Sequence, residues 1–186
     1  MSVLRPAMMS DSEDIMEIRT DVRDYLCSPF YGNDVKQDEW MRHVLLDDTK
    51  IIMVMEDRYG EVFGYGILHD IDHIHKKCMG QVQVDAEYRG EGHGTAMWKE
   101  LIRISMDDLG MNKIYLEVLV DNAPAIYVYS KLGFELEGTL RRHYWHDGKW
   151  AHVHILALHR ETCDGQMMSK YVEQTRRLLC EVGDDS

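Results

Sequence analysis

A glycine-rich segment in the middle of the chain has the composition of a phosphate-binding loop. It runs Arg89-Gly90-Glu91-Gly92-His93-Gly94-Thr95, between a predicted strand and a predicted long helix. Glycines let the backbone approach an anion closely, and the free N–H groups in the first turn of a helix point toward it. An arginine at the edge of such a loop adds positive charge. The segment therefore predicts a site for a phosphate group.

Two other phosphate-binding patterns do not fit this loop. A dinucleotide-binding fingerprint needs Gly-x-Gly-x-x-Gly, whereas Gly90, Gly92 and Gly94 are spaced by two. A nucleoside-triphosphate loop ends in Gly-Lys-Ser/Thr, and this sequence does not. A glycine-rich surface loop without a ligand is the alternative that the motif alone leaves open.

The elements that would position this loop alternate along the chain. Apolar runs and alternation predict strands, and apolar residues three and four apart predict helices. The predicted strands are 2–5, 51–55, 62–68, 77–84, 114–119, 134–141 and 152–158, and three predicted helices are 12–26, 36–46 and 95–109. A fourth helix is predicted to be capped by Asn122, with Pro124 in its first turn, and to be closed by Gly133. The middle of the chain favours parallel pairing and the flanking hairpins favour antiparallel pairing. We expect an α/β fold with a mixed, mostly antiparallel central sheet flanked by helices.

Composition limits the classes of partner. Hydrophobic residues make up 45% and charged residues 29% of the chain, as in soluble globular proteins. No apolar run approaches the roughly 20 residues that cross a bilayer, and the N-terminal residues do not resemble a secretory signal. The net charge of -12 repels phosphate backbones. We expect a cytoplasmic protein with neither a nucleic-acid nor a membrane partner.

The length of 186 residues fits one domain with a terminal appendage. We place the domain at 1–160 and the appendage at 161–186, where a helix over 166–180 precedes an acidic end. The appendage is interpreted as an extension or as an oligomer contact, for example in a homodimer.

Ten histidines and four cysteines raise the question of a metal site. His73 and His75, followed by Cys78, share one strand face, and so do His152 and His154. Neither group has a carboxylate cluster of known metal-binding spacing, so we predict no metal and interpret these histidines as surface or acceptor-site residues. The scattered cysteines are interpreted as reduced, structural thiols.

Two segments together resemble the motifs of the GNAT family of N-acetyltransferases. Residues 81–94 contain Arg89-x-x-Gly92-x-Gly94, similar to the family pattern Arg/Gln-x-x-Gly-x-Gly/Ala, and residues 122–134 resemble its second motif. Residues 137–150 resemble the C-terminal part of many members, and the likeness spans about 3–158. The resemblance implies the acyl-CoA N-acyltransferase fold, acetyl-CoA as co-substrate, and direct transfer of an acetyl group to a primary amine in a ternary complex.

The resemblance also implies roles for individual residues. The strand containing Val82, Gln83 and Val84 would bind the pantetheine arm, and the N–H groups from Arg89 to Thr95 would bind the pyrophosphate. Asn122 stands where members contact pantetheine, and Tyr129 stands at the position of the usual general acid. A core tyrosine is the alternative for Tyr129, because apolar residues surround it.

Acetyl transfer from a thioester requires an amine without its extra proton, a donor for the oxyanion and a proton for the leaving thiolate. The oxyanion donor would be a backbone N–H near Val82–Val84. Glu117 lies in an apolar strand, and its spacing to Asn122 and Tyr129 resembles that in the ribosomal-protein alanine acetyltransferases, where the matching glutamate is the base. An exposed glutamate without a role is the alternative, and Glu87 is a second candidate base.

The acceptor stays open at this stage. In the family, the first two helices, the loop between them and the last hairpin form the acceptor pocket. Here they supply aromatic and acidic residues: Asp24, Tyr25, Phe30, Tyr31, Asp34, Asp38, Glu39, Trp40, His143, Tyr144 and Trp145. Such a pocket suits a small-molecule or peptide amine: a protein N-terminus or lysine, a polyamine, an amino acid or a xenobiotic amine. A non-catalytic acetyl-CoA-binding regulatory module is the alternative outside the enzymes.

Overall fold

The computed structural model describes residues 2–21, 33–146 and 148–163. Its strands are β1 (Val3–Pro6), β2 (Ile51–Glu56), β3 (Val62–Asp72), β4 (Lys77–Val84), β5 (Lys113–Leu119), β6 (Glu135–His146) and β7 (Lys149–His159). Its helices are α1 (Ser12–Asp21), α2 (Asp34–Leu46), α3 (His93–Arg103), α4 (Ala123–Lys131) and α5 (Arg160–Cys163). Short turns of helix lie at Met9–Asp11, Ala86–Tyr88 and Ile104–Asp108.

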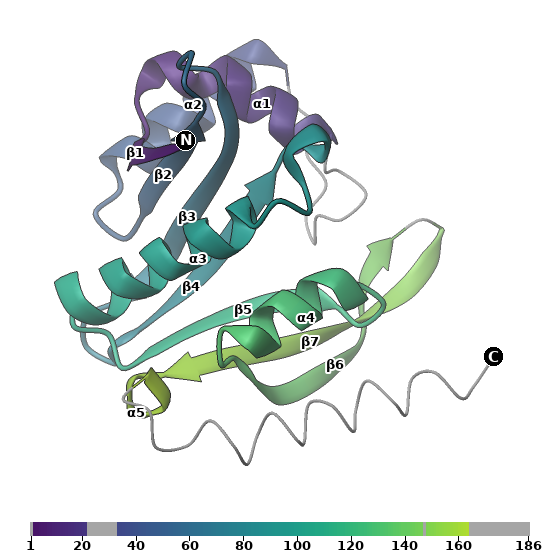
Figure 1. Ribbon diagram of the computed structural model, residues 1–186. Coiled ribbons are helices and arrows are strands. Elements are labelled where there is room, and N and C mark those ends of the chain that lie inside the picture. The colour runs from purple at the N-terminus through teal and green to yellow at the C-terminus, as the bar shows by residue number, and fades with distance from the viewer. Residues whose placement is uncertain (1, 22–32, 147, 164–186) are drawn as a thin grey trace.

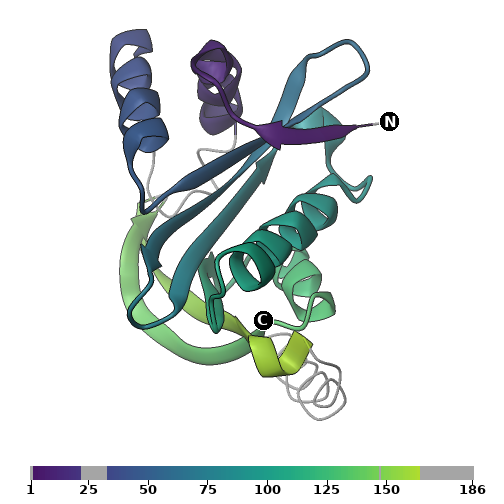
Figure 2. The ribbon, with the colours of Figure 1, turned by 90° about the vertical axis from the view of Figure 1, so that its left-hand side faces the viewer.

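Within these residues the seven strands form one sheet in the order β1-β2-β3-β4-β5-β7-β6. Every neighbouring pair is antiparallel except β4 and β5. Helices α3 and α4 cover one face, and α1 and α2 lie on the other (Figure 1 and Figure 2). The predicted α/β fold with a mixed, mostly antiparallel sheet is confirmed.

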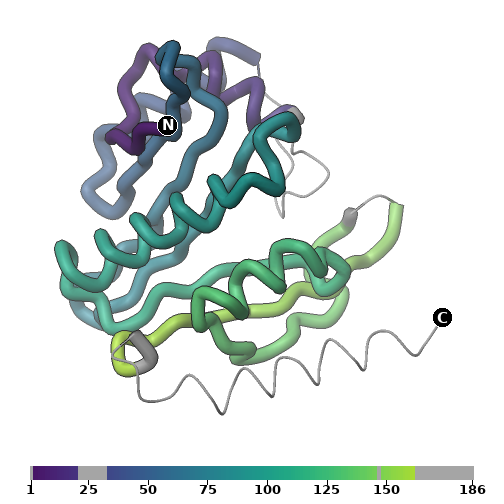
Figure 3. Tube along the Cα trace, viewed as in Figure 1, coloured from purple at the N-terminus to yellow at the C-terminus, as the bar shows by residue number. Residues whose placement is uncertain are grey.

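The one parallel pair opens the sheet in its middle. β4 and β5 pair only where Lys77–Met79 face Lys113–Tyr115. Beyond that point β4 continues to Val84 and β5 to Leu119, and the two strands separate (Figure 1 and Figure 3). The sheet therefore has an N-terminal half, β1 to β4, and a C-terminal half, β5 to β7, joined at one end.

Alternation along the strands supplies a core on each face of the sheet. In β2, Met53 and Met55 are buried on the side of α3, whereas Ile52 and Val54 are buried on the side of α1 and α2. Helix α3 packs directly on β4, since a Cβ atom at Gly80 would lie 2.8 Å from the Trp98 ring. Full burial of side chains of this size contributes about 1.5–3 kcal/mol each, so the packing of α3 fixes the strand next to the opening.

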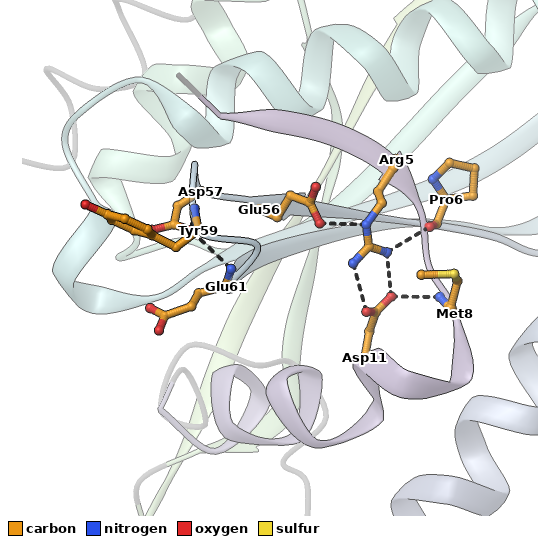
Figure 4. A network of polar contacts seen from close by, with 8 residues as sticks. All are labelled: Arg5, Pro6, Met8, Asp11, Glu56, Asp57, Tyr59 and Glu61. Atoms are coloured by element: carbon orange, nitrogen blue, oxygen red, sulfur yellow. Dashed lines mark hydrogen bonds and ion pairs between the residues drawn. The ribbon is translucent and has the colours of Figure 1, made fainter.

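A partly buried ion-pair network fixes the start of the chain to the sheet (Figure 4). Arg5 Nε donates to Glu56 Oε2 over 2.7 Å, and the two Nη atoms donate to the Asp11 carboxylate over 2.8 and 2.9 Å. The Met8 N–H adds a third hydrogen bond to Asp11, of 2.7 Å. Burial raises the pKa of Asp11, but the hydrogen bonds from Arg5 and Met8 outweigh it and hold that pKa below its usual range. The network joins β1, β2 and the entrance to α1.

Several elements differ from their predicted bounds. The helix predicted over 95–109 begins at His93 and changes to a π-helical turn at Ile104–Asp108, where the Leu109 N–H bonds to the Ile104 carbonyl. Strands β6 and β7 are longer than predicted because polar and aromatic residues near the hairpin turn still pair, as Trp145 does with Trp150.

Some predictions about the helices are corrected or lie outside the described residues. The spacing of Trp40, Val44 and Leu45 predicts that they share one face of the helix expected over 36–46, but Leu45 is 38% exposed. Gln37 and Met41 are buried on α2 together with Val44. Four of the expected acceptor-pocket residues, Asp24, Tyr25, Phe30 and Tyr31, lie outside the described part of the chain, as do the end of the first helix beyond residue 21 and the tail helix predicted over 166–180. In that part no helix is both long and apolar enough to span a bilayer.

Candidate active site

The glycine-rich loop has the geometry of an anion site. Gly90 and Gly92 have φ angles of 83° and 89°, a region that favours glycine, and a Cβ atom at either position would meet nothing within 4 Å. Gly92 caps α3, and the first intrahelical bond runs from the Ala96 N–H to the Gly92 carbonyl. The N–H groups of His93, Gly94 and Thr95 therefore precede that bond at the positive end of the helix dipole.

The side chains of this loop hold its shape. Arg89 Nε donates to the Val84 carbonyl over 3.0 Å and ties the loop to the end of β4. His93 lies edge-on to Phe63 at 4.8 Å, and its Nε2 is 3.4 Å from Glu91 Oε2. Residues Arg89, Gly90, Glu91 and Gly92 are exposed. An anionic ligand that needs close backbone approach fits this loop.

The end of β4 lines the opening of the sheet. Val82, Gln83 and Val84 pair with β3 in an unbroken register, opposite Gly66, Tyr65 and Gly64. They lie beyond the three pairs that join β4 to β5. Their strand edge on the β5 side therefore borders the opening, where backbone groups are placed to bind an extended ligand. On the face of α1 and α2, the buried Tyr65 hydroxyl donates to Gln83 Oε1 over 2.6 Å.

Helix α4 begins at the opposite border of the opening. The Asn122 side-chain oxygen accepts the Ala125 N–H over 3.3 Å, Pro124 stands in the first turn, and Gly133 follows the helix with a φ angle of 91°. These are the capping roles predicted from the sequence. Whether Asn122 also contacts the pantetheine arm is a separate hypothesis.

Tyr129 lies on the face of α4 that packs toward α3. Its ring meets Trp98 edge-on at 5.4 Å and Phe134 at 5.9 Å, and the side chain is half-buried. Aromatic edges fix the ring plane while the hydroxyl at its end can act on a neighbouring group. Tyr129 therefore packs against the core, as one of the two interpretations of the sequence expects, and its role as general acid stays a prediction.

Glu117 lies on the opposite face of β5. Ile114, Leu116 and Val118 are buried in the core on the side of α3 and α4, so Glu117 points to the face shared with α1 and α2. It is half-buried and accepts a 2.6 Å hydrogen bond from the Tyr144 hydroxyl of β6. Both residues are among the candidate site residues predicted from the sequence, but no pattern in the sequence indicates that they are hydrogen-bonded to each other. Glu87, the other candidate base, is exposed in the turn before the glycine loop.

Of the histidine and cysteine candidates, His73, His75 and Cys78 lie apart from this arrangement, whereas His152 accepts the Arg142 N–H close to Tyr144. His73 and His75 are exposed in the β3–β4 turn, where the His75 N–H bonds to Asp72. His154 Nδ1 is 2.8 Å from Thr139 Oγ1, and burial lowers the pKa of that imidazole. Cys78 is buried and free, and burial raises the pKa of its thiol to about 12. No group of three or more His, Cys, Asp or Glu side chains in the described residues could hold a metal ion.

Comparison with known proteins identifies the family to which this chain is related. A sequence model of the acetyltransferase (GNAT) family matches residues 15–134. The L-amino acid N-acetyltransferase AaaT of Escherichia coli is 30% identical over 159 residues, which cover 83% of this chain and 96% of that protein. The spermidine N(1)-acetyltransferase of Vibrio cholerae is 27% identical over 125 residues, or 67% of this chain and 72% of that protein.

A solved structure shows the same fold. The crystal structure of spermidine N-acetyltransferase from Vibrio cholerae in complex with CoA and spermine superposes with a TM-score of 0.82. The match has 23% sequence identity and covers 87% of this chain and 96% of that chain. The arrangement of sheet, opening and helices is therefore that of the acyl-CoA N-acyltransferase fold.

The chain belongs to the acetyltransferase (GNAT) family, as the sequence motifs predict. It is an N-acetyltransferase that uses acetyl-CoA as co-substrate and transfers the acetyl group to an amine. Acetyl-CoA supplies the activated acetyl group.

Proposed function

We propose that the two borders of the sheet opening hold acetyl-CoA and receive its leaving thiolate. The N–H groups from Arg89 to Thr95 bind the pyrophosphate, and Asn122 contacts the pantetheine arm. The strand edge at Val82, Gln83 and Val84 binds the same arm and offers a backbone N–H to the oxyanion. Tyr129, on the opposite border, gives its proton to the thiolate. The support is the open backbone at Gly90 and Gly92 and the position of Tyr129 on the inner face of α4.

The acceptor amine reaches the opening from the face of α1 and α2, and Glu117 accepts its proton. An ammonium group has no lone pair for attack until it loses a proton. The observation that carries this proposal is the Glu117 carboxylate, which projects from β5 on that face with Tyr144 as its hydrogen-bond donor. Because Glu117 and Tyr129 lie on opposite faces of β5, the amine and the thiolate exchange protons with different residues.

A small molecule with an amino group next to a carboxylate is the acceptor class that we favour. AaaT, whose name states that it acts on L-amino acids, matches this chain over 96% of its length. The exposed Arg141 and Arg142 directly precede the segment of β6 that reaches Glu117. A carboxylate for the ammonium group and guanidinium groups for the acid group would together recognise an amino acid.

A polyamine is the second candidate, and the charge of the protein favours it. The net charge of -12 attracts a polycation over long distances. Acidic residues gather on α1: burial raises the pKa of Asp14, and the charges of Asp11, Glu17, Glu13 and Glu61 raise it further. One relative is named as a spermidine acetyltransferase.

An amine panel separates the two classes. CoA thiol release is measured with L-amino acids, with their carboxamides and with spermidine and spermine. Amino acids should be acetylated well and their carboxamides poorly, because only the carboxylate distinguishes them. Turnover of the polyamines alone would favour the second candidate, and a panel without any accelerated release would contradict the whole proposal.

A matched pair of variants tests the arginines. Arg142→Gln should lower kcat/KM for an amino acid by about tenfold, the equivalent of about 1.4 kcal/mol, and leave kcat/KM for its carboxamide unchanged. Lys149→Gln removes an exposed cation at the hairpin turn and should change neither value. Equal losses for amino acid and carboxamide would remove the carboxylate-binding role from Arg142.

A further inference from the structure

The hydrogen bond between Tyr144 and Glu117 fixes the direction of the Tyr144 hydroxyl on the sheet face shared with α1 and α2, which is the proposed side of the acceptor amine. The Tyr144 hydroxyl donates to Glu117 Oε2 over 2.6 Å, and both side chains are half-buried. An ionised carboxylate only accepts hydrogen bonds, so the one proton of the phenol is directed to Glu117. The phenol oxygen can then receive a donor through its lone pairs. An ammonium N–H is such a donor, and Tyr144 and Glu117 together are suited to bind it.

An irregularity in β6 brings Tyr144 to this position. Leu140 pairs with Val153, but Tyr144 pairs with Ala151, so residues 141–143 of β6 lie opposite His152 alone. An unbroken register would place Tyr144 opposite Lys149, at the hairpin turn. The extra residues form a bulge, and a bulge of this kind redirects side chains next to functional sites.

His152 holds the bulge in place. Arg142 has a φ angle of 52°, and its N–H donates to His152 Nδ1 over 3.0 Å. This N–H lies in the bulge, where the regular ladder does not continue, so the imidazole supplies its acceptor. Nδ1 accepts and carries no proton, which places the imidazole proton on Nε2. His152 is thus a positioning residue for Tyr144.

We propose that Tyr144 relays the proton of the acceptor amine to Glu117, an inference that rests on the proposed role of Glu117 as base. The ammonium N–H proton passes to the Tyr144 oxygen while the Tyr144 hydroxyl proton passes to Glu117 Oε2. The amine becomes neutral, Glu117 becomes protonated and Tyr144 is unchanged. The amine nitrogen then forms the C–N bond and the thioester C–S bond breaks, with Tyr129 giving its proton to the leaving thiolate. The second N–H proton is released to solvent, from which Tyr129 regains a proton.

Tyr144→Phe tests the relay, because it removes the hydroxyl and keeps the ring. With saturating acetyl-CoA, kcat/KM for the best amine of the panel should fall about 100-fold, the lower range for a lost acid–base group. The unfolding midpoint and the affinity for acetyl-CoA should not change. Tyr59→Phe is the matched control, because Tyr59 is 73% exposed in the β2–β3 turn. An unchanged kcat/KM for Tyr144→Phe would overturn the proposal.

A double variant tests whether the two residues act as one unit. Glu117→Gln combined with Tyr144→Phe should lose no more activity than Glu117→Gln alone. Once the carboxylate that accepts the proton is absent, the Tyr144 hydroxyl can no longer contribute to proton transfer. Losses that multiply would overturn the relay. An active wild type with an unaffected Tyr144→Phe variant contradicts the relay alone, whereas full activity in Glu117→Gln contradicts the proposed base as well.

Variants of His152 test the positioning role. His152→Leu removes the acceptor for the Arg142 N–H and should reproduce the loss of kcat/KM seen for Tyr144→Phe. His152→Asn offers an oxygen near the position of Nδ1 and should restore most of the activity. Full activity in His152→Leu would show that the bulge does not depend on this contact and would remove the positioning role.

Discussion

Two carboxylates, one beside each half of the sheet, accept hydrogen bonds from donors that differ in charge. Asp11, in the turn before α1, is buried, and Glu117, on β5, is half-buried. In the N-terminal half, Asp11 is held by the Arg5 guanidinium and by a backbone N–H. In the C-terminal half, Glu117 accepts from the neutral hydroxyl of Tyr144. A cationic partner stabilises the anion and opposes its protonation, whereas a phenol can pass a proton on. The first arrangement suits a structural anchor and the second suits acid–base chemistry.

We expect the loss of a neutral hydroxyl in the C-terminal half to reduce the rate of acetyl transfer more than it reduces the free energy of unfolding. In Tyr129→Phe the ring contacts with Trp98 and Phe134 remain and the proton for the thiolate is lost. We expect kcat to fall about 100-fold, with little change in the affinity for acetyl-CoA. Steady-state kinetics and a binding titration measure both.

Tyr127 provides the control for this variant. It lies on the same helix and is 54% exposed, so Tyr127→Phe should retain the wild-type kcat. A wild-type kcat in Tyr129→Phe would assign the acid role to another group and leave Tyr129 as a packing residue.

Loss of the Asp11 charge in the N-terminal half should reduce the free energy of unfolding and leave the rate of acetyl transfer unchanged. Asp11→Asn removes the anion that Arg5 and Met8 bind, and we expect a loss of about 2 kcal/mol in the free energy of unfolding at pH 7. The folded pKa of Asp11 is lowered from 3.8, so its contribution is complete above that pH and is lost as the pH falls through the folded value. Denaturant titrations of wild type and variant should therefore converge below pH 3.8.

Asp57→Asn is a matched change in the neighbouring turn (Figure 4). Asp57 accepts the N–H groups of Tyr59 and Glu61, so an uncharged acceptor should replace it at smaller cost. If Asp11→Asn and Asp57→Asn were equally stable, the ion pair with Arg5 would not be the anchor.

Alanine variants of two glycines distinguish the effect of backbone strain on stability from the effect on acetyl-CoA affinity. Gly92 and Gly60 have φ angles of 89° and 85° and open space for a Cβ atom. Alanine at either position should cost about 1–2 kcal/mol of stability. Gly92→Ala should also weaken acetyl-CoA binding about tenfold, because the Cβ atom and the altered N–H directions face the anion. Equal affinities for acetyl-CoA in the two variants would contradict the assignment of the loop.

The smallest expected effect concerns His154 in the C-terminal half. Burial lowers the folded pKa of His154 from 6.5, so its contribution to stability is complete above that pH and is lost as the pH falls through the folded value. His154→Gln should reduce the stability difference between pH 7 and pH 5 by less than about 1 kcal/mol. The same measurement on His75→Gln, a change in an exposed turn, should match wild type, and an equal change in both variants would contradict the effect of burial.

Short-range patterns predicted the backbone conformation at several positions of the glycine loop and of α4. The glycines at 90, 92 and 94, the Asn122 cap and Gly133 each define a backbone conformation within a few residues, and the structure shows the predicted caps. The alternation in β5 likewise placed Glu117 on the face opposite Ile114, Leu116 and Val118. Short-range patterns contain this information because one or two neighbours determine it.

Contacts that depend on the pairing register of distant strands could not be predicted from the sequence. The contact between Tyr144 and Glu117 depends on extra residues in one strand and on a histidine in the next, and no local pattern marks such a bulge. The π-helical turn after α3, in which Ile104, Ser105 and Met106 are buried, was not predicted either, because the apolar spacing of that segment is that of a regular helix. In α2, the inward position of Gln37 depends on its hydrogen bond to the Ser12 carbonyl, a partner far away in the sequence.

The pH dependence of kcat/KM for Glu117→Gln, measured beside wild type and Asp11→Asn, tests the contrast between the two carboxylates most directly. Glu117→Gln should lose about 100-fold or more in kcat/KM, lack the part of the profile that rises as the base loses its proton, and unfold at the wild-type denaturant concentration. Asp11→Asn should retain the wild-type profile and unfold earlier. A wild-type pH profile in Glu117→Gln, or an altered profile in a folded Asp11→Asn, would contradict the assignment of chemistry to one carboxylate and anchoring to the other.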